Sequence, residues 1–194
     1  TRSVSSDMRL RLSVLVLGAP AVALRELMKA PRKTVVGVSL NMIAPTGQFF
    51  SDKLINLGTN RFSFKPEVAL SHPLGNHWLI DVYAGVWFFT KNNSFYPGNA
   101  ERTQEPMGTF QAHLSYTIKP LMWVALDATY YTGGKSSING TYNDDRQSNS
   151  RIGATAVLPV SKRSSVKLSF SRGAIVRVGQ NFTTFSVGWQ MTWF

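Results

Sequence analysis

The sequence predicts an all-β fold: an antiparallel, up-and-down β-barrel that crosses a membrane. Three observations lead to this prediction. Short segments in which apolar and polar residues strictly alternate recur along the chain, as in strands with one apolar and one polar face. The connections between these segments alternate between short and long, as in outer-membrane barrels. Charged residues make up only 16% of the 194 residues, against about 25% in typical soluble proteins.

Residues 183–194 show the alternation most clearly. The large apolar side chains there are separated by small or polar residues; they are Phe185, Val187, Trp189, Met191 and Trp193. The terminal Phe194 is one residue out of phase with this apolar face. The usual assembly signal of outer-membrane barrels places the last aromatic residue on the apolar face. We therefore expect that Trp193 takes this role or that the strand bulges near its end.

The same pattern predicts eight earlier strands, at residues 9–16, 36–42, 62–71, 78–88, 110–118, 122–131, 151–158 and 166–171. Pro66 lies within the third of them and cannot donate a ladder hydrogen bond, so we expect a bulge or bend there. Residues 23–30 have the composition of a short helix that ends before Pro31.

The first of these strands has an alternative interpretation. Residues 8–23 resemble a signal peptide, with a basic start, an apolar middle and small residues after it. However, Leu10 and Leu12 alternate with Arg9 and Arg11, which is not typical of a signal peptide, and Met8 is not the first residue. We favour a strand; if the segment were a signal, the remaining eight strands would close by themselves.

The connections predict which end of each strand lies outside the cell. Residues 72–77, 119–121 and 159–164 are short turns, whereas residues 45–60, 91–108 and 132–148 are long and polar. In outer-membrane barrels the short turns are periplasmic and the long loops extracellular. The connection at residues 19–33 is long although it lies at the periplasmic end, and we interpret it as an insertion.

Aromatic residues then form two girdles at different heights, as expected for a wall that spans a bilayer. Between the girdles are small aliphatic residues such as Ala84 and Ala112. The residues predicted to lie at the membrane interface are Trp78, Phe88, Phe110, Tyr116, Tyr130, Trp189 and Trp193. The expected location is therefore the bacterial outer membrane, and the expected partners are its lipid, its lipopolysaccharide and the barrel-assembly machinery.

Nine strands do not suit a single-chain bacterial barrel, which has an even number. We therefore expect residues 1–194 to be one domain that lacks its N-terminal strands and forms part of a barrel of twelve.

Several segments resemble one known family. They are Asp7-Met-Arg-Leu-Arg-Leu-Ser-Val, Leu17-Gly-Ala-Pro-Ala, Ile55-Asn-Leu-Gly-Thr-Asn-Arg-Phe-Ser-Phe-Lys-Pro-Glu67, Leu126-Asp-Ala-Thr-Tyr-Tyr-Thr-Gly-Gly134 and Asn149-Ser-Arg-Ile-Gly-Ala-Thr155. With these blocks the chain resembles the outer-membrane transporter family labelled "putative MetA-pathway of phenol degradation". The resemblance implies a β-barrel and a transport role, but it supplies no binding residues.

The residues that alternate with the apolar ones should face inward, and they are candidates for the lining of a transport path. Those predicted to line the lumen are Arg9, Arg11, Lys65, Glu67, Asp81, Tyr83, His113, Asp127, Thr129, Arg151 and Lys167. We expect a hydrated, slightly cationic lumen that lets small solutes, aromatic or anionic ones among them, diffuse passively. The alternative is a lumen closed by ion pairs, in a structural or adhesion barrel without a pore.

Other candidates are weaker. His113 and Ser115 resemble the His-x-Ser of lipid A deacylases, which makes an acyl hydrolase a remote alternative. Asn143-Asp-Asp145 lacks the spacing of a calcium loop. We therefore expect no catalytic residue, metal or cofactor. The net charge of +11 comes without a nucleic-acid motif, so no nucleic acid is expected. Loop cations could bind the phosphates of lipopolysaccharide; they are Lys53, Arg61, Lys91, Arg102, Lys135 and Arg146.

Overall fold

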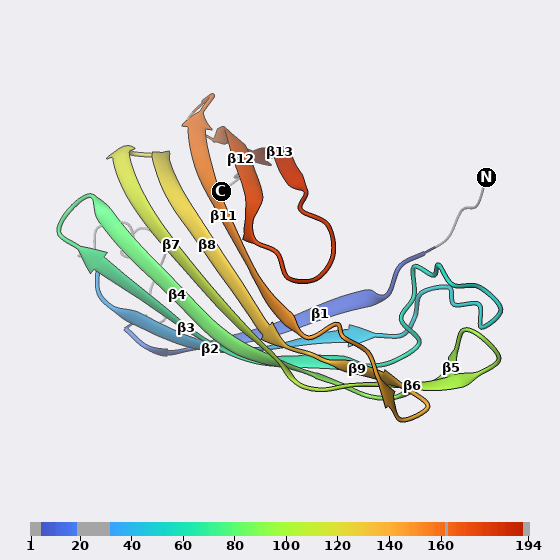
Figure 1. Cartoon of the computed structure of the whole chain (residues 1–194). Coiled ribbons are helices and arrows are strands. Elements are labelled where there is room, and N and C mark those ends of the chain that lie inside the picture. The colour runs from blue at the N-terminus through green and yellow to red at the C-terminus, as the bar shows by residue number, and fades with distance from the viewer. Residues whose placement is uncertain (1–4, 19–31, 162, 192–194) are drawn as a thin grey trace.

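A computed structural model describes residues 5–18, 32–161 and 163–191 of the chain. Nine strands form one antiparallel sheet in which neighbours along the chain are neighbours in space (Figure 1). In order they are β1 (Met8–Leu17), β2 (Val35–Ala44), β3 (Ser63–Leu74), β4 (Trp78–Phe89), β7 (Met107–Lys119), β8 (Met122–Gly133), β11 (Gln147–Pro159), β12 (Ser164–Ile175) and β13 (Thr183–Met191). The nine predicted strands and the all-β, up-and-down architecture are confirmed. In the part of the chain that the structure describes, no helix is long and apolar enough to cross a membrane.

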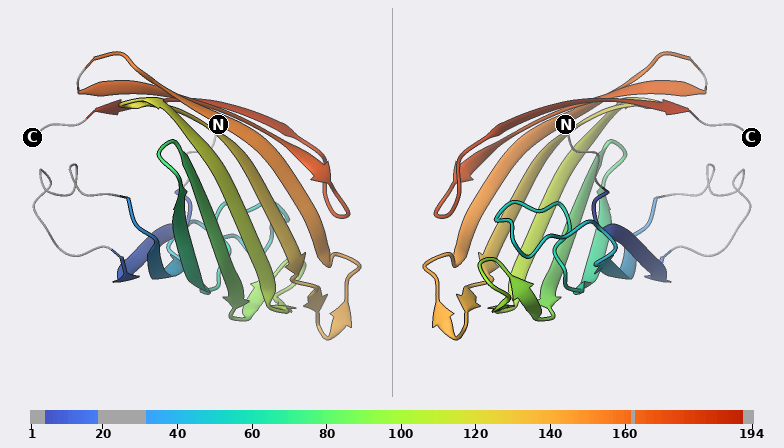
Figure 2. Two further views of the ribbon diagram at one scale, coloured as in Figure 1. Left: turned by 90° about the vertical axis from the view of Figure 1, so that its left-hand side faces the viewer. Right: turned by 90° about the vertical axis from the view of Figure 1, so that its right-hand side faces the viewer.

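The sheet is strongly twisted and curved, so that it forms part of a barrel wall (Figure 2). The strand pairs described by the structure leave β1 and β13 as the two edges, with no pairing between them. The predicted helix at residues 23–30 and the terminal aromatic pair Trp193 and Phe194 lie outside the described residues.

Strand register places all polar residues of the alternating pattern on one face. A layer of this face runs across five strands through Asp81, His113, Asp127, Gly153 and Ser171, each directly opposite the next. The adjacent layer on the other face is apolar from β4 to β13, where it consists of Ile80, Leu114, Leu126, Ala154, Phe170 and Phe185; on β3 the polar His72 lies opposite Ile80. Because residues directly opposite in a sheet share a face, the period-two sequence pattern becomes two chemically distinct surfaces.

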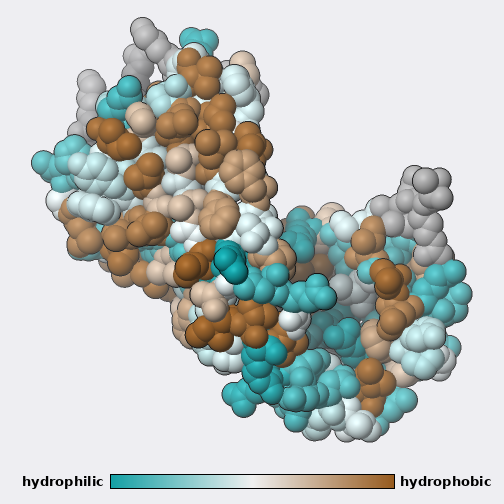
Figure 3. Space-filling view, turned by 45° about the horizontal axis from the view of Figure 1, so that its top comes forward, coloured by the Kyte–Doolittle hydropathy of each residue, from teal (hydrophilic) through white to brown (hydrophobic). Residues whose placement is uncertain are grey.

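The exposure of these two surfaces is the reverse of that in a soluble protein. Lys65 and Glu67 on the concave polar face are 9% and 6% exposed, whereas Leu12 and Leu126 on the apolar face are 71% and 65% exposed. In the space-filling view, hydrophobic residues cover much of the strand-rich part, and hydrophilic residues gather around the hollow near the loops (Figure 3). An apolar surface of this extent requires a lipid environment.

The long connections contain structure that the sequence did not indicate. Four short strands form a second sheet in the order β10–β9–β6–β5; they are β5 (Asn92–Phe95), β6 (Ala100–Gln104), β9 (Ser136–Ile138) and β10 (Thr141–Tyr142). Residues 91–108 and 132–148, which the sequence marks only as long and polar, thus contain two hairpins. The hairpin turns are made by residues with positive φ: Gly98 (68°) and Asn99 (61°) in one, Asn139 (49°) and Gly140 (81°) in the other. Asn-Gly is a strong hairpin signal because both residues tolerate this conformation.

No bulge forms at Pro66, although the expected disturbance of the ladder occurs there. The register of β3 with β2 continues through the Leu40–Pro66 pair. Opposite β4, pairing is interrupted at Lys65 and Pro66 and resumes at Glu67 in the same register. The sheet therefore tolerates the missing N–H of the proline by losing two paired positions on one side, without inserting a residue.

Candidate functional site

The candidate site is the concave polar face of the nine-stranded sheet. By strand register, all eleven residues predicted to line the lumen lie on this face. Each one comes from a strand whose apolar residues face the other way, so the fold itself fixes their direction. The structure brings them together in three groups.

The first group is centred on the buried carboxylate of Glu67. Its Oε1 accepts from the guanidinium of Arg11 at 3.1 Å and from the hydroxyl of Ser39 at 3.3 Å, while its Oε2 pairs closely with Lys65. The Lys65 ammonium also lies 5.5 Å from the ring centroid of Trp87. Two cations and one carboxylate from β1 and β3, together with a hydroxyl from β2, thus satisfy each other; Lys65 and Glu67 are buried, and Arg11 is half exposed.

The second group joins three further strands through Asp127. The Oδ1 atom of Asp127 lies 2.6 Å from Nδ1 of His113, and its Oδ2 accepts a hydrogen bond of 2.7 Å from Thr155. The ring of Tyr83 meets that of His113 edge-on at 5.8 Å. Through these contacts the polar face continues from β4 to β11, in the middle of the sheet.

The third group surrounds Arg151. Its guanidinium donates to the carbonyl and hydroxyl oxygens of Ser171, to the carbonyl of Phe182 at 3.2 Å and to Thr184 at 3.4 Å. It also stacks over the ring of Phe182, 4.1 Å from the centroid. Among the described residues, the hydrogen-bond partners of the Arg151 guanidinium are therefore all neutral groups.

The remaining predicted residues stay apart from these groups. Among the described residues, Arg9, Asp81 and Lys167 form no ion pair, and the Thr129 hydroxyl forms no hydrogen bond. Ser39 and Thr155 were not singled out from the sequence, although both bind the charged groups. The His113–Asp127 pair had a readable signal, because the two residues are equidistant from the predicted turn at residues 119–121.

The predicted girdle residues lie on the apolar face at two heights. Trp78 and Tyr116 are directly opposite each other near the short turns, with ring centroids 4.8 Å apart. Phe110 and Tyr130 are opposite each other closer to the long connections, as are Phe88 and Phe64. Trp189 pairs with Val166 near the short-turn end of β12 and β13. Trp193 lies outside the described residues.

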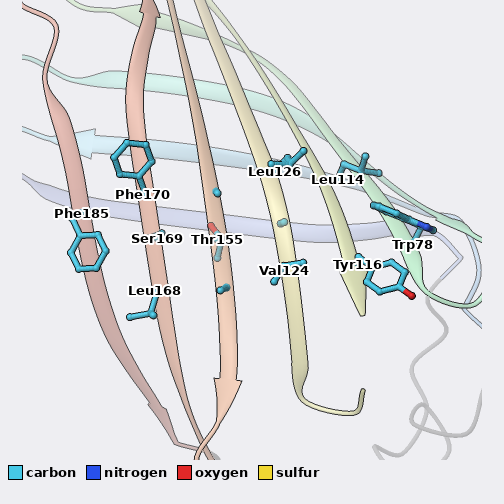
Figure 4. Close-up of a pocket in the computed structure, with 13 residues that line it drawn as sticks. Trp78, Leu114, Tyr116, Val124, Leu126, Thr155, Leu168, Ser169, Phe170 and Phe185 are labelled. Atoms are coloured by element: carbon cyan, nitrogen blue, oxygen red, sulfur yellow. The ribbon is translucent and has the colours of Figure 1, made fainter. Parts of the chain in front are cut away.

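A shallow hollow of about 450 Å³ lies in the apolar face between these heights. The lining residues come from β4, β7, β8, β11, β12 and β13. Figure 4 shows Trp78 and Tyr116 at one side of the hollow and Phe170 and Phe185 at the other. The small residues Ala154 and Ala156 between larger neighbours create this hollow. Its lining is what the acyl chains of a surrounding bilayer would contact.

For the acyl-hydrolase alternative, the structure provides an acid that orients His113, but the candidate nucleophile Ser115 does not contact the histidine. Asp127 holds His113, whereas the Ser115 hydroxyl donates to the carbonyl of Leu79 at 3.3 Å. Within the described part of the chain no hydrogen bond joins His113 to Ser115. A base that does not contact its nucleophile does not activate it.

The acidic residues near Asn143 stabilise the loops. Asp145 accepts from the N–H of Ser136 at 2.8 Å and from its hydroxyl at 2.5 Å, and Asp144 pairs with Arg177 at 2.6 Å. Burial raises the pKa of Asp145, but the Ser136 hydrogen bonds and the charge of Arg102 outweigh it and lower the pKa overall. No group of three or more potential metal ligands occurs among the described residues.

Comparison with known protein families gives an independent result. The profile of the family described as "Putative MetA-pathway of phenol degradation" matches residues 10–176. The chain belongs to this family. All the residues that carried the resemblance in the sequence, except Asp7, Met8 and Arg9, lie within this match.

A solved structure of another protein has a similar fold. The chain is similar to an outer membrane channel from Pseudomonas putida F1, with a TM-score of 0.81 and 22% sequence identity over 97% of this chain. It spans 66% of the length of that channel. A search of curated proteins found no match. Together with the apolar outer face, these findings confirm the predicted β-barrel class, and they fit the expected location in the outer membrane.

Proposed function

We propose that the chain forms part of the wall of an outer-membrane channel through which small molecules diffuse passively. The observation that carries the proposal is the continuous polar face, which crosses the sheet from β1 to β13 on the side opposite the lipid-facing residues. A barrel that closes around such a face encloses a hydrated lumen if it has enough strands. The similarity to a channel of greater length supports a complete barrel of about twelve strands.

The charges on this face favour anions as solutes. The predicted lumen residues comprise five cations and three carboxylates. Lys65 and Arg11 share Glu67, whereas Arg9 and Lys167 form no ion pair with any described carboxylate. An excess of uncompensated positive charge along a narrow path raises the local concentration of anions. Tyr83 beside His113 would add an aromatic surface on which a planar solute could stack.

Planar-bilayer recording of the full-length protein tests this function. We expect discrete conductance steps and a reversal potential in a potassium chloride gradient that indicates preference for chloride. Lys167→Glu should reduce the anion preference, because the side chain lies on the inner face and lacks a carboxylate partner. The matched control is Lys119→Glu at the short-turn end of β7, which should leave the selectivity unchanged.

Two results would contradict this proposal. If the protein shows no steps although its gel mobility still changes on boiling, as in a folded barrel, the structural or adhesion alternative gains support. The proposal also includes no catalytic step and no cofactor, so an enzymatic activity of the barrel is the second contradicting result. Hydrolysis of lipid A ester bonds that His113→Ala abolishes would support the acyl-hydrolase alternative.

The proposal places the girdle residues at the two membrane interfaces and the long connections outside the cell. Lipid, lipopolysaccharide and the barrel-assembly machinery would then be the partners of the wall and of its terminal strand. Of the six loop cations considered for lipopolysaccharide phosphates, Lys53 and Lys91 are already paired, at 3.9 Å with Asp52 and at 3.0 Å with Glu101. This pairing makes them weaker candidates than Arg146, for which no side-chain partner is described.

A further inference from the structure

A small cavity lies among the long connections, apart from the polar face of the main sheet. Its volume is about 140 Å³, and its lining combines the apolar Phe49, Leu54 and Phe95 with Arg61 and Arg102. A cavity of this size holds several non-hydrogen atoms but is well below the roughly 300–1,000 Å³ of drug-sized pockets. It therefore suits a small molecule.

The walls of the cavity are fixed by hydrogen bonds between three segments: residues 45–62, β5 and β6. Asn92 is 2% exposed and joins two of them; its Nδ2 donates to the carbonyl of Thr59 at 3.1 Å and its Oδ1 accepts from Asn60 at 2.9 Å. Asp7 accepts from both the N–H and the hydroxyl of Thr59, at 2.8 and 2.6 Å. These bonds preform the cavity, which lowers the entropy cost of binding a ligand.

Two guanidinium groups line this cavity without a carboxylate partner. Arg61 lies over the ring of Phe89 and donates to Gln104 at 2.5 Å, but its Nη1 is shielded from solvent and has no acceptor among the described residues. Arg102 lies over the ring of Phe95, 4.9 Å from the centroid, and forms no ion pair in the described part of the chain. Burial first, and then the charge of Arg102, lower the pKa of Arg61 to about 10, so the Arg61 guanidinium remains positive at neutral pH.

The nearby carboxylates are engaged elsewhere. Asp7 is held by Thr59 and by the N–H of Gly47 at 2.9 Å, Asp145 by Ser136, and Glu101 by Lys91. None of them lies within ion-pair distance of either arginine among the described residues. Two like charges held close together, one with an unused buried donor, are a strong reason to expect an anion between them.

We propose that this cavity binds a small organic anion: a carboxylate attached to a compact apolar body such as one aromatic ring. The planar guanidinium presents donors in the fork that a carboxylate accepts. The two phenylalanines and the leucine of the lining would cover the apolar body. This lining favours an organic anion over an inorganic phosphate, which has no apolar part.

The site goes beyond the proposed channel function, because it lies in the connections and needs no open lumen. A small anion could bind there and then either enter a pore or remain outside. Binding and conductance can therefore fail independently, and each can be measured without the other.

Ligand-observed NMR on the full-length barrel in detergent micelles tests the proposal. Benzoate is the probe, and benzyl alcohol, acetate and inorganic phosphate are compared with it. We expect benzoate to bind in the millimolar range or tighter, and the other three at least about tenfold more weakly, because each lacks the charge or the apolar body.

Arg102→Gln should weaken benzoate binding by about tenfold or more, since it removes a charged donor of the cavity. Arg61→Gln should do the same. Arg146→Gln is the matched control: it removes an arginine from the neighbouring connection that does not line the cavity, and it should leave binding unchanged. The gel shift on boiling verifies that each variant remains a folded barrel.

Three outcomes would overturn the proposal. Equal binding of benzyl alcohol and benzoate would show that the arginines do not recognise a carboxylate. Preferential binding of phosphate would assign the two arginines to an inorganic or lipid phosphate. An effect of Arg146→Gln as large as that of Arg102→Gln would show that only the overall charge of the loops matters.

Discussion

Glu67→Ala is expected to lower the free energy of unfolding of the barrel by about 3 kcal/mol or more. The Glu67 side chain is only 5% exposed, and that of Lys65 is 11% exposed. Removing the carboxylate would leave a buried ammonium without a counter-charge and would release the Ser39 hydroxyl and the Arg11 guanidinium. An unpaired buried charge costs far more than the pair contributes. Urea unfolding of the full-length protein in lipid vesicles, followed by tryptophan fluorescence, measures the loss.

Lys167→Ala provides the comparison for this experiment. Lys167 lies on the same face but forms no ion pair with any described residue, so its removal should change the free energy of unfolding by less than about 0.5 kcal/mol. A loss below about 1 kcal/mol for Glu67→Ala would show that water in the lumen solvates the remaining lysine, and the buried cluster would then have no structural importance.

Leu126→Arg should cost about 2–4 kcal/mol, because it places a charge on the lipid-facing side near the middle of β8. Leu126 is 65% exposed and lies opposite Leu114 and Ala154 on the apolar face. A charge in the hydrocarbon region loses its hydration, and the residues directly opposite Leu126 on this side are apolar. The same unfolding experiment in vesicles gives the value.

Gln111→Arg is the control for orientation. Gln111 lies on the polar face opposite Tyr83 and Thr129, so an arginine there should be tolerated within about 1 kcal/mol. If Gln111→Arg were the more damaging change, the assignment of the two faces would be reversed. Equal effects would indicate that neither face contacts lipid.

The main sheet could be predicted from the sequence because its information is local. An alternation such as that of Leu10, Leu12 and Val14 against Arg9 and Arg11 fixes both the strand and the direction of every side chain. The short turns then define which strands are neighbours. Counting residues outward from the turn at residues 119–121 would also have predicted the His113–Asp127 contact.

The parts that could not be predicted depend on contacts between distant segments. Strands β9 and β10 contain three and two residues, which is too short for an alternation to be recognised. The cluster around Glu67 requires side-chain conformations across three strands in addition to their register. Arg61 and Arg102 belong to different connections, and only the packing of those connections brings their side chains to one cavity.

If the long connections lie outside the cell, as proposed, the pairing of β6 with β9 has a consequence for how extracellular proteins recognise this one. Arg102, Thr103 and Gln104 are matched with Ile138, Ser137 and Ser136, so two connections that the sequence separates by two membrane strands share one backbone ladder. Their amide groups are occupied by each other and are poor substrates for an extracellular protease, which needs an extended, unpaired segment. An antibody raised against the folded barrel would recognise a composite epitope from both connections, and a peptide copied from either one alone would not compete for it.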